Sequence, residues 1–172
     1  MTRPTKGIIL VNTMNDNSNN KSSKLENYQA GRLRELIEEI IHCCQERVLF
    51  QSQKFNLTPA ELRCILLFNN EKYLTTKGLA QKLEVAKSRV TKIMEGLTHK
   101  KLVQCIDDPR DARVKLIRLT TAGHNKSNDI HQFIKDIHYQ LLTNLNSGDR
   151  KSVLNSLELL RFSMEAVKEK MA

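Results

Sequence analysis

The sequence predicts a mainly α-helical fold with one small β-hairpin. Apolar residues recur three and four positions apart toward both ends of the chain, which is the period of an amphipathic helix. Only between positions 102 and 119 does the period change to two, which is the period of a strand. With 172 residues, 40% of them apolar, the chain can bury the core of one domain that carries an added interaction element.

A long first helix is predicted from Leu25 to about Gln53. Its apolar stripe alternates steps of three and four residues: Leu33, Leu36, Ile37, Ile40, Ile41, Cys44 and Val48. Residues 1–24 are rich in Asn, Ser, Thr and Lys without a helical period, so we expect a flexible tail there. A second helix opens with the capping box Thr58-Pro59-Ala60-Glu61 and ends near Asn69-Asn70.

Two short helices follow, joined by a tight turn. Thr75 or Thr76 caps the first, and the second runs from about Ala86 to Lys100. The second helix points four apolar side chains inward: Val90, Ile93, Met94 and Leu97. Its opposite side carries the side-chain types that bind bases and phosphates: Lys87, Ser88, Arg89, Thr91 and Lys92. This pattern predicts a helix-turn-helix with a recognition helix.

The β-hairpin comes directly after the recognition helix, which is the position of a wing. Its tip is polar, and we expect Arg110 and Arg113 to reach an adjacent minor groove, whose negative potential attracts guanidinium groups. Asp108 or Asp111 would orient one of these arginines. The alternative is an ordinary surface hairpin with local ion pairs.

The chain returns to helix at Thr120-Thr121-Ala122-Gly123, and Asn146-Ser147-Gly148-Asp149 separates two long amphipathic helices. Their apolar faces exceed what a small winged lobe needs, so we expect a second copy of the chain to cover them; an intramolecular bundle is the alternative. The predicted organisation is a tail (1–24), an N-terminal dimerisation helix (25–57), a winged helix-turn-helix lobe (58–120) and C-terminal dimerisation helices (121–172).

The positive charge is concentrated on the predicted DNA-binding lobe. From position 72 to 118 there are twelve Lys and Arg against five Asp and Glu, which is +7 of the total formal charge of +9. Such an excess favours a polyanionic partner, and nucleic acid is the first candidate. A lysine-rich surface that is merely solvated is the alternative.

Other classes of protein are disfavoured. No apolar run approaches the ~20 residues of a membrane span, so we expect neither secretion nor membrane insertion. The four cysteines, at 43, 44, 64 and 105, lack CxxC spacing, which fits reduced thiols in a cytoplasm. No nucleophile, base and orienting group form a pattern, so we expect no enzyme and no cofactor.

The order of elements resembles the MarR family of bacterial winged-helix regulators. The residues that carry the resemblance are the Leu79-Ala80-x-x-Leu83 helix, the run from Val85 to Thr91, and above all the stretch Asp108 to Arg113 followed by Leu119-Thr-Thr-Ala-Gly123. The resemblance implies a cytoplasmic, nucleoid-associated homodimer that binds a pseudo-palindromic operator in double-stranded DNA. It identifies Arg113, with Asp111 before it, as the wing arginine, and we expect Thr76 and Lys77 to contact the DNA backbone.

Two positions depart from the family pattern. Lys101 replaces a glycine after the recognition helix, so the helix either ends differently or tolerates about 1 kcal/mol of backbone strain. Cys105 replaces a basic residue, which removes one phosphate contact. Gly96 lies inside the recognition helix and should soften it.

The signal that releases the DNA is the least determined feature. The resemblance implies a repressor released by a small aromatic or phenolic ligand, an oxidant or a metal. Cys43 and Cys44 are the candidate redox residues, but adjacent helical side chains point about 100° apart. His124, His131 and His138 are about 10 Å apart in steps of seven, too far to share one ion, so we assign no metal site. A small ligand is therefore the leading prediction, and a winged-helix module for non-specific DNA or protein contacts is the other alternative.

Overall fold

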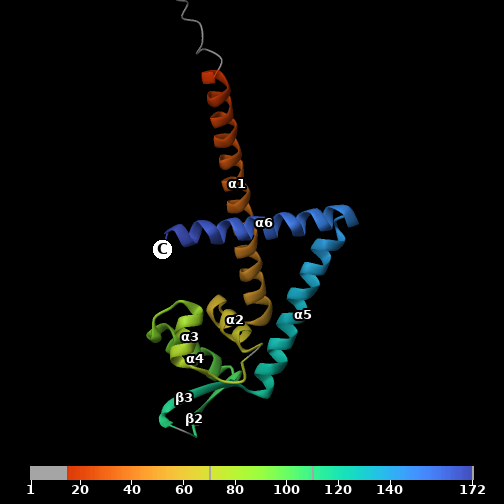
Figure 1. Ribbon diagram of the computed structural model, residues 1–172. Coiled ribbons are helices and arrows are strands. Elements are labelled where there is room, and N and C mark those ends of the chain that lie inside the picture. Colours follow the sequence, from red (N-terminus) through yellow and green to blue (C-terminus); the bar gives the residue numbers. More distant parts are fainter. Residues whose placement is uncertain (1–14, 70, 110, 172) are drawn as a thin grey trace, which may run out of the picture. The chain divides into compact units, whose positions relative to one another are not determined.

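The computed structural model describes residues 15–69, 71–109 and 111–171, with side chains described from residue 23 onward except at 112 and 113. The helices are α1 (Asn15–Phe55), α2 (Pro59–Leu66), α3 (Thr76–Leu83), α4 (Lys87–His99), α5 (Thr121–Thr143) and α6 (Ser147–Met171). A 3-10 turn, Leu67–Asn69, follows α2, and the strands are β1 (Leu74–Thr75), β2 (Val103–Asp108) and β3 (Asp111–Leu119). Figure 1 confirms the prediction of a mainly helical fold with one small hairpin.

The chain divides into two units between Phe50 and Gln51. In the first unit, α1 begins at Asn15 rather than at the predicted Leu25, so residues 15–24 are helical where we expected a flexible tail. Once a helix exists, each further residue that becomes helical gains one hydrogen bond. A polar segment without an apolar stripe can therefore continue the helix. The expectation for residues 1–14 lies outside the described residues.

In the second unit, α2, α3 and α4 gather beside the β2–β3 hairpin (Figure 1). Their contact is a hydrophobic core to which each helix contributes fully buried side chains, namely Leu62, Cys64 and Ile65 from α2, Leu79 from α3, and Val90 and Leu97 from α4. The first half of α5 joins this core through Ile130, which has no exposed surface. The helix-turn-helix is therefore a packed lobe rather than two isolated helices.

The sheet has the order β1-β3-β2, and both pairings are antiparallel. Val103 pairs with Leu119 and Cys105 with Ile117, while β1 adds Leu74 opposite Ile117. Across β2 and β3, Lys115 forms an ion pair with Asp107, and the Arg118 guanidinium donates to the side-chain oxygen of Gln104. The sequence did not predict β1, because two residues are too few to show an alternating pattern.

Three helices end in the same left-handed turn, and none of them uses glycine there. The residues with positive φ are Asn56 (54°), Glu84 (56°) and Lys101 (58°). In each case the next amide donates to a carbonyl five residues back: Leu57 to Ser52, Val85 to Ala80 and Leu102 to Leu97. This is the Schellman motif, so Lys101 tolerates the strain and does not avoid it.

We expect Lys101→Gly to raise the free energy of unfolding by about 0.5–1 kcal/mol, because glycine adopts a left-handed backbone without steric cost. Chemical denaturation of the purified protein measures this change. Lys100→Gly is the matched control. Lys100 has a φ of −76° and binds Glu61, so its replacement should destabilise the fold. A loss of stability in Lys101→Gly would contradict the left-handed turn.

Candidate nucleic-acid interface

The five predicted reading residues share the exposed face of α4. Lys87, Ser88, Arg89, Thr91 and Lys92 are all exposed, whereas Val90, Ile93 and Leu97 on the opposite face are buried. Met94, which we expected to point inward, is half-buried. The Thr91 hydroxyl donates to the Lys87 carbonyl at 3.2 Å, which leaves its methyl group and a lone pair available. Within the described part of the chain, no ion pair engages Lys87, Arg89 or Lys92.

The start of α3 supplies the two predicted backbone contacts. Thr75 is the cap, since its hydroxyl accepts from the Gly78 amide at 3.0 Å, and this resolves the choice between Thr75 and Thr76. Thr76 is the first helical residue and is half-buried, while Lys77 is exposed. An exposed lysine at the start of a helix suits a phosphate group.

The tip of the wing is described only in part. Asp111 is exposed at the start of β3 and lies opposite Asp108 in the strand register. Arg110 lies outside the described residues. Arg113 belongs to β3 by its backbone, but its side chain is outside the described part. The roles of both arginines in the minor groove stay predictions.

A buried carboxylate holds α4 against α2. Glu61 is 4% exposed, and its Oε2 accepts from the Thr58 amide at 2.7 Å and from Lys100 Nζ at 2.7 Å. Gly96 makes this approach possible, because a Cβ at that position would overlap Oε1 of Glu61. Gly96 is thus a packing requirement, and the sequence predicted only its softening effect on the helix.

Burial alone would raise the pKa of Glu61, but the hydrogen bonds from Lys100 and Thr58 outweigh it and lower the pKa below the ordinary 4.5. The charged form is therefore the form that the fold stabilises. A group with a lowered folded pKa contributes its full stability above its unfolded pKa and loses it as pH falls. The pair should consequently weaken in acid.

We expect Glu61→Gln to reduce stability by about 1–3 kcal/mol at pH 7, because a charge-assisted bond is lost while the cap acceptor remains. On acidification from pH 7 to about pH 3, the stability gap between wild type and variant should narrow, starting near the ordinary pKa of 4.5. Urea denaturation across this range measures it. Glu95→Gln, at an exposed position of α4, is the control and should leave the profile unchanged. A gap of unchanged size between pH 7 and pH 3 would contradict the pKa assignment.

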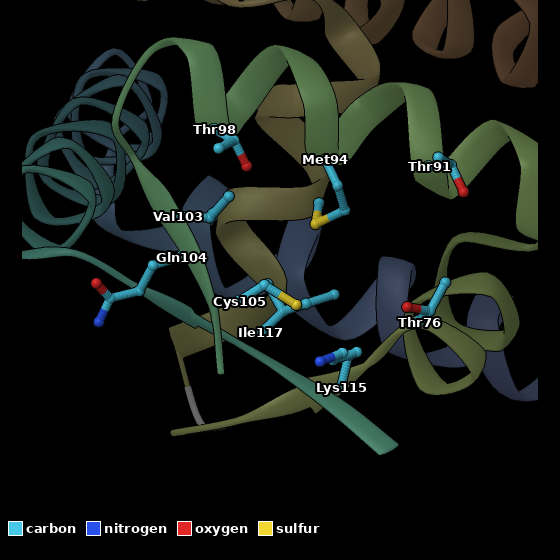
Figure 2. Close-up of a pocket in the computed structure, with 9 residues that line it drawn as sticks. All are labelled: Thr76, Thr91, Met94, Thr98, Val103, Gln104, Cys105, Lys115 and Ile117. Carbon is cyan, nitrogen blue, oxygen red and sulfur yellow. The ribbon is translucent and has the colours of Figure 1, made fainter. Parts of the chain in front are cut away.

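A cavity of about 180 Å³ lies between α4 and the wing (Figure 2). Its lining is Thr91, Met94 and Thr98 from α4, Thr76 from α3, Val103, Gln104 and Cys105 from β2, and Lys115 and Ile117 from β3. Cys105 is therefore a wall of this cavity, at the position where the family pattern has a basic residue. The surface that lines the cavity is mainly apolar. The charge of Lys115 is already paired with Asp107.

The cysteines differ in accessibility. Cys43 and Cys44 are exposed on α1, and Arg47 Nη2 lies 3.9 Å from Cys44 Sγ. Cys64 is buried, and burial together with the nearby Glu61 raises the pKa of its thiol to about 12. Cys64 is therefore an inert core residue at neutral pH.

The histidines form local contacts. His42 Nδ1 lies 3.7 Å from Glu46 Oε2, and His131 Nδ1 donates to the Ser127 carbonyl at 2.7 Å. Among the described residues, no three His, Cys, Asp or Glu side chains form a group that could hold a metal ion. Over the same residues, no helix has the length and apolar composition required to cross a membrane.

Sequence reasoning missed the contacts that position α4. The capping box at Thr58 was visible, but its bond to Lys100, 39 residues from Glu61, has no local signal. The same holds for the bond from the Thr120 hydroxyl to the Lys101 carbonyl, 19 residues apart. Only the glycines at 96 and 123 hint that another segment approaches closely there.

Comparisons with known proteins agree with this geometry. No family model matches the chain. The multiple antibiotic resistance protein MarR of Escherichia coli K12 is 26% identical over 95 residues, which cover 55% of this chain and 66% of MarR, just under two thirds of its length.

Solved structures show the same fold. Staphylococcus aureus MepR, a transcription regulator of the multidrug efflux pump MepA, matches with a TM-score of 0.68 and 20% identity over 75% of this chain and 96% of MepR. A MepR–DNA complex matches with a TM-score of 0.62 and 20% identity over 74% and 96% of the two chains. YusO from Bacillus subtilis matches with a TM-score of 0.65 and 21% identity over 81% and 97%. The predicted resemblance to MarR is confirmed in fold.

Proposed function

We propose that this chain is a DNA-binding transcription regulator of the MarR family, and that α4 is its recognition helix. The carrying observation is the exposed basic face of α4, which makes no ion pair with any described residue and has a buried apolar face behind it. That face lies on a fold shared with MepR, for which a DNA complex exists. Lys87, Ser88, Arg89, Thr91 and Lys92 enter the major groove, and Thr76 and Lys77 contact the backbone. In this proposal, Arg113 of the wing enters the minor groove together with Arg110 and Asp111.

The active form is a homodimer on a pseudo-palindromic operator. Support comes from the apolar faces of the long helices: none of the residues Ser147–Met171 is buried, and apolar side chains at 153, 154, 157, 164 and 167 are exposed. On α1, Leu33, Leu36, Ile40 and Ile41 are also exposed. A second copy of the chain would cover such surfaces. Two recognition helices then lie about 34 Å apart, in successive major grooves.

The regulator acts as a cytoplasmic repressor that a small aromatic or phenolic ligand releases. The cavity between α4 and the wing supports this proposal, since it is largely apolar and adjoins the recognition helix. A thiol-responsive regulator of the same fold is the second candidate, because Cys43 and Cys44 are both exposed. The protein has no catalytic role in this proposal.

The first test is a binding titration against the DNA upstream of the chain's own gene and against random-sequence duplex, at two salt concentrations. We expect tighter binding to the upstream fragment that persists at the higher salt, because base contacts add to the salt-sensitive phosphate term. Equal and salt-sensitive binding to both duplexes would favour a non-specific DNA-binding module. Sedimentation of the free protein at the same concentrations reports whether it is a dimer.

Two single variants separate base reading from backbone contact. Arg89→Ala should cost about 1–3 kcal/mol on the specific duplex and reduce discrimination between duplexes. Lys87→Ala should weaken binding to every duplex alike and lower the salt slope by about one. Both positions are exposed, so the thermal midpoint should not change. Equal losses of discrimination in the two variants would place the reading face elsewhere on α4.

A further inference from the structure

The recognition helix and α5 are joined directly, although the whole wing lies between them in the chain. The Leu102 amide ends α4 by donating to the Leu97 carbonyl at 2.9 Å. The next two carbonyls accept from the cap residue of α5: the Thr120 hydroxyl donates to the Lys101 carbonyl at 2.7 Å, and the Thr120 amide donates to the Leu102 carbonyl at 3.0 Å. Two hydrogen bonds from Thr120 therefore join the end of α4 to the cap of α5.

Gly123 brings the first turn of α5 onto the same peptide. Its amide donates to the Thr120 hydroxyl at 3.0 Å, so this hydroxyl caps α5 while it binds Lys101. A Cβ on Gly123 would overlap the Leu102 carbonyl oxygen and would lie 3.2 Å from Cβ of Leu119. Any other residue at 123 must therefore push α5 away from the end of α4.

The contact also has little freedom to slip. Lys101 has a left-handed φ of 58°, and its amide donates a hydrogen bond to the Thr98 carbonyl at 2.8 Å, which fixes this turn. On the α5 side, Ser127 and Ile130 are buried in the lobe, so the first half of the helix is held on two sides. We call the contact of Lys101 and Leu102 with Thr120 and Gly123 the joint. A rotation of α5 is consequently transmitted to α4 through it.

We propose that Thr120 and Gly123 are positioning residues for DNA recognition, which set the direction of α4 relative to α5. The inference rests on the proposed function, in which α5 leads toward the dimer interface and α4 enters the major groove. In such a dimer, the joint on each protomer determines how far apart, and at what angle, the two recognition helices are presented. It touches no DNA itself.

The experiment measures how strictly each variant requires the operator spacing. Binding is titrated on the specific duplex and on duplexes with one base pair added or removed at the centre, which moves one half-site by about 3.4 Å and a tenth of a turn. The variants are Gly123→Ala and Thr120→Val. Gly148→Ala is the matched control, since Gly148 lies in the first turn of α6 and its Cβ would meet only ordinary contact, at 3.4 Å. Thr120→Ser keeps the hydroxyl and serves as the rescue.

We expect the wild type, Gly148→Ala and Thr120→Ser to bind the shifted duplexes at least about tenfold more weakly than the specific one, the size of one lost base-pair contact. Gly123→Ala and Thr120→Val should lose most of that tenfold preference or move it to a shifted duplex. A general loss of folded protein lowers affinity for all three duplexes by the same factor. An unchanged spacing preference in both joint variants would overturn the proposal.

Amide hydrogen exchange without DNA tests the joint separately from the proposed function. Gly123→Ala should accelerate exchange at the Thr120 amide, which donates to the Leu102 carbonyl, whereas Gly148→Ala should not. If the wild type prefers no duplex, the proposed function fails, and this exchange result alone decides whether the joint exists. A Thr120 amide that stays protected in Gly123→Ala would then disprove it.

Discussion

The carboxylate of Glu61 is the constraint on which the placement of the recognition helix depends. A buried acid is unfavourable unless it is paired, and Glu61 meets that condition by binding the Thr58 amide at the start of α2 and Lys100 at the end of α4. One side chain thereby caps one helix and fixes the position of another. The exposed basic face of α4 has a defined direction because the opposite face is buried and the end of the helix is held in this way.

Gly96 and Gly123 serve close approach rather than unusual backbone angles. Neither of them has a positive φ, whereas Asn56, Glu84 and Lys101 have one. Gly96 admits the Glu61 carboxylate and Gly123 admits the Leu102 carbonyl. The chain therefore accepts strain at its helix ends, where it is local, and keeps glycine where a Cβ would separate two elements of the lobe.

The elements with local signals could be predicted from the sequence. The capping box at Thr58, the apolar face of α4, the strand period of the wing and the helix restart at Thr120 all correspond to observed structure. The two-residue strand β1 and the bond between Glu61 and Lys100 could not be predicted, because each depends on segments far apart in the chain. The sequence reading offered two outcomes at Lys101, and only the three-dimensional structure distinguishes them.

The closure of the wing on itself has an evolutionary consequence. Because residues 102 and 120 are bonded at its base, the tip of the hairpin projects from the lobe without connecting its helices. Added residues at its tip would cost only the slowly growing entropy of a longer loop and would leave both flanking helices in place. The length and charge of the tip can therefore diversify independently of the core, so that related proteins could acquire different DNA preferences on an unchanged scaffold.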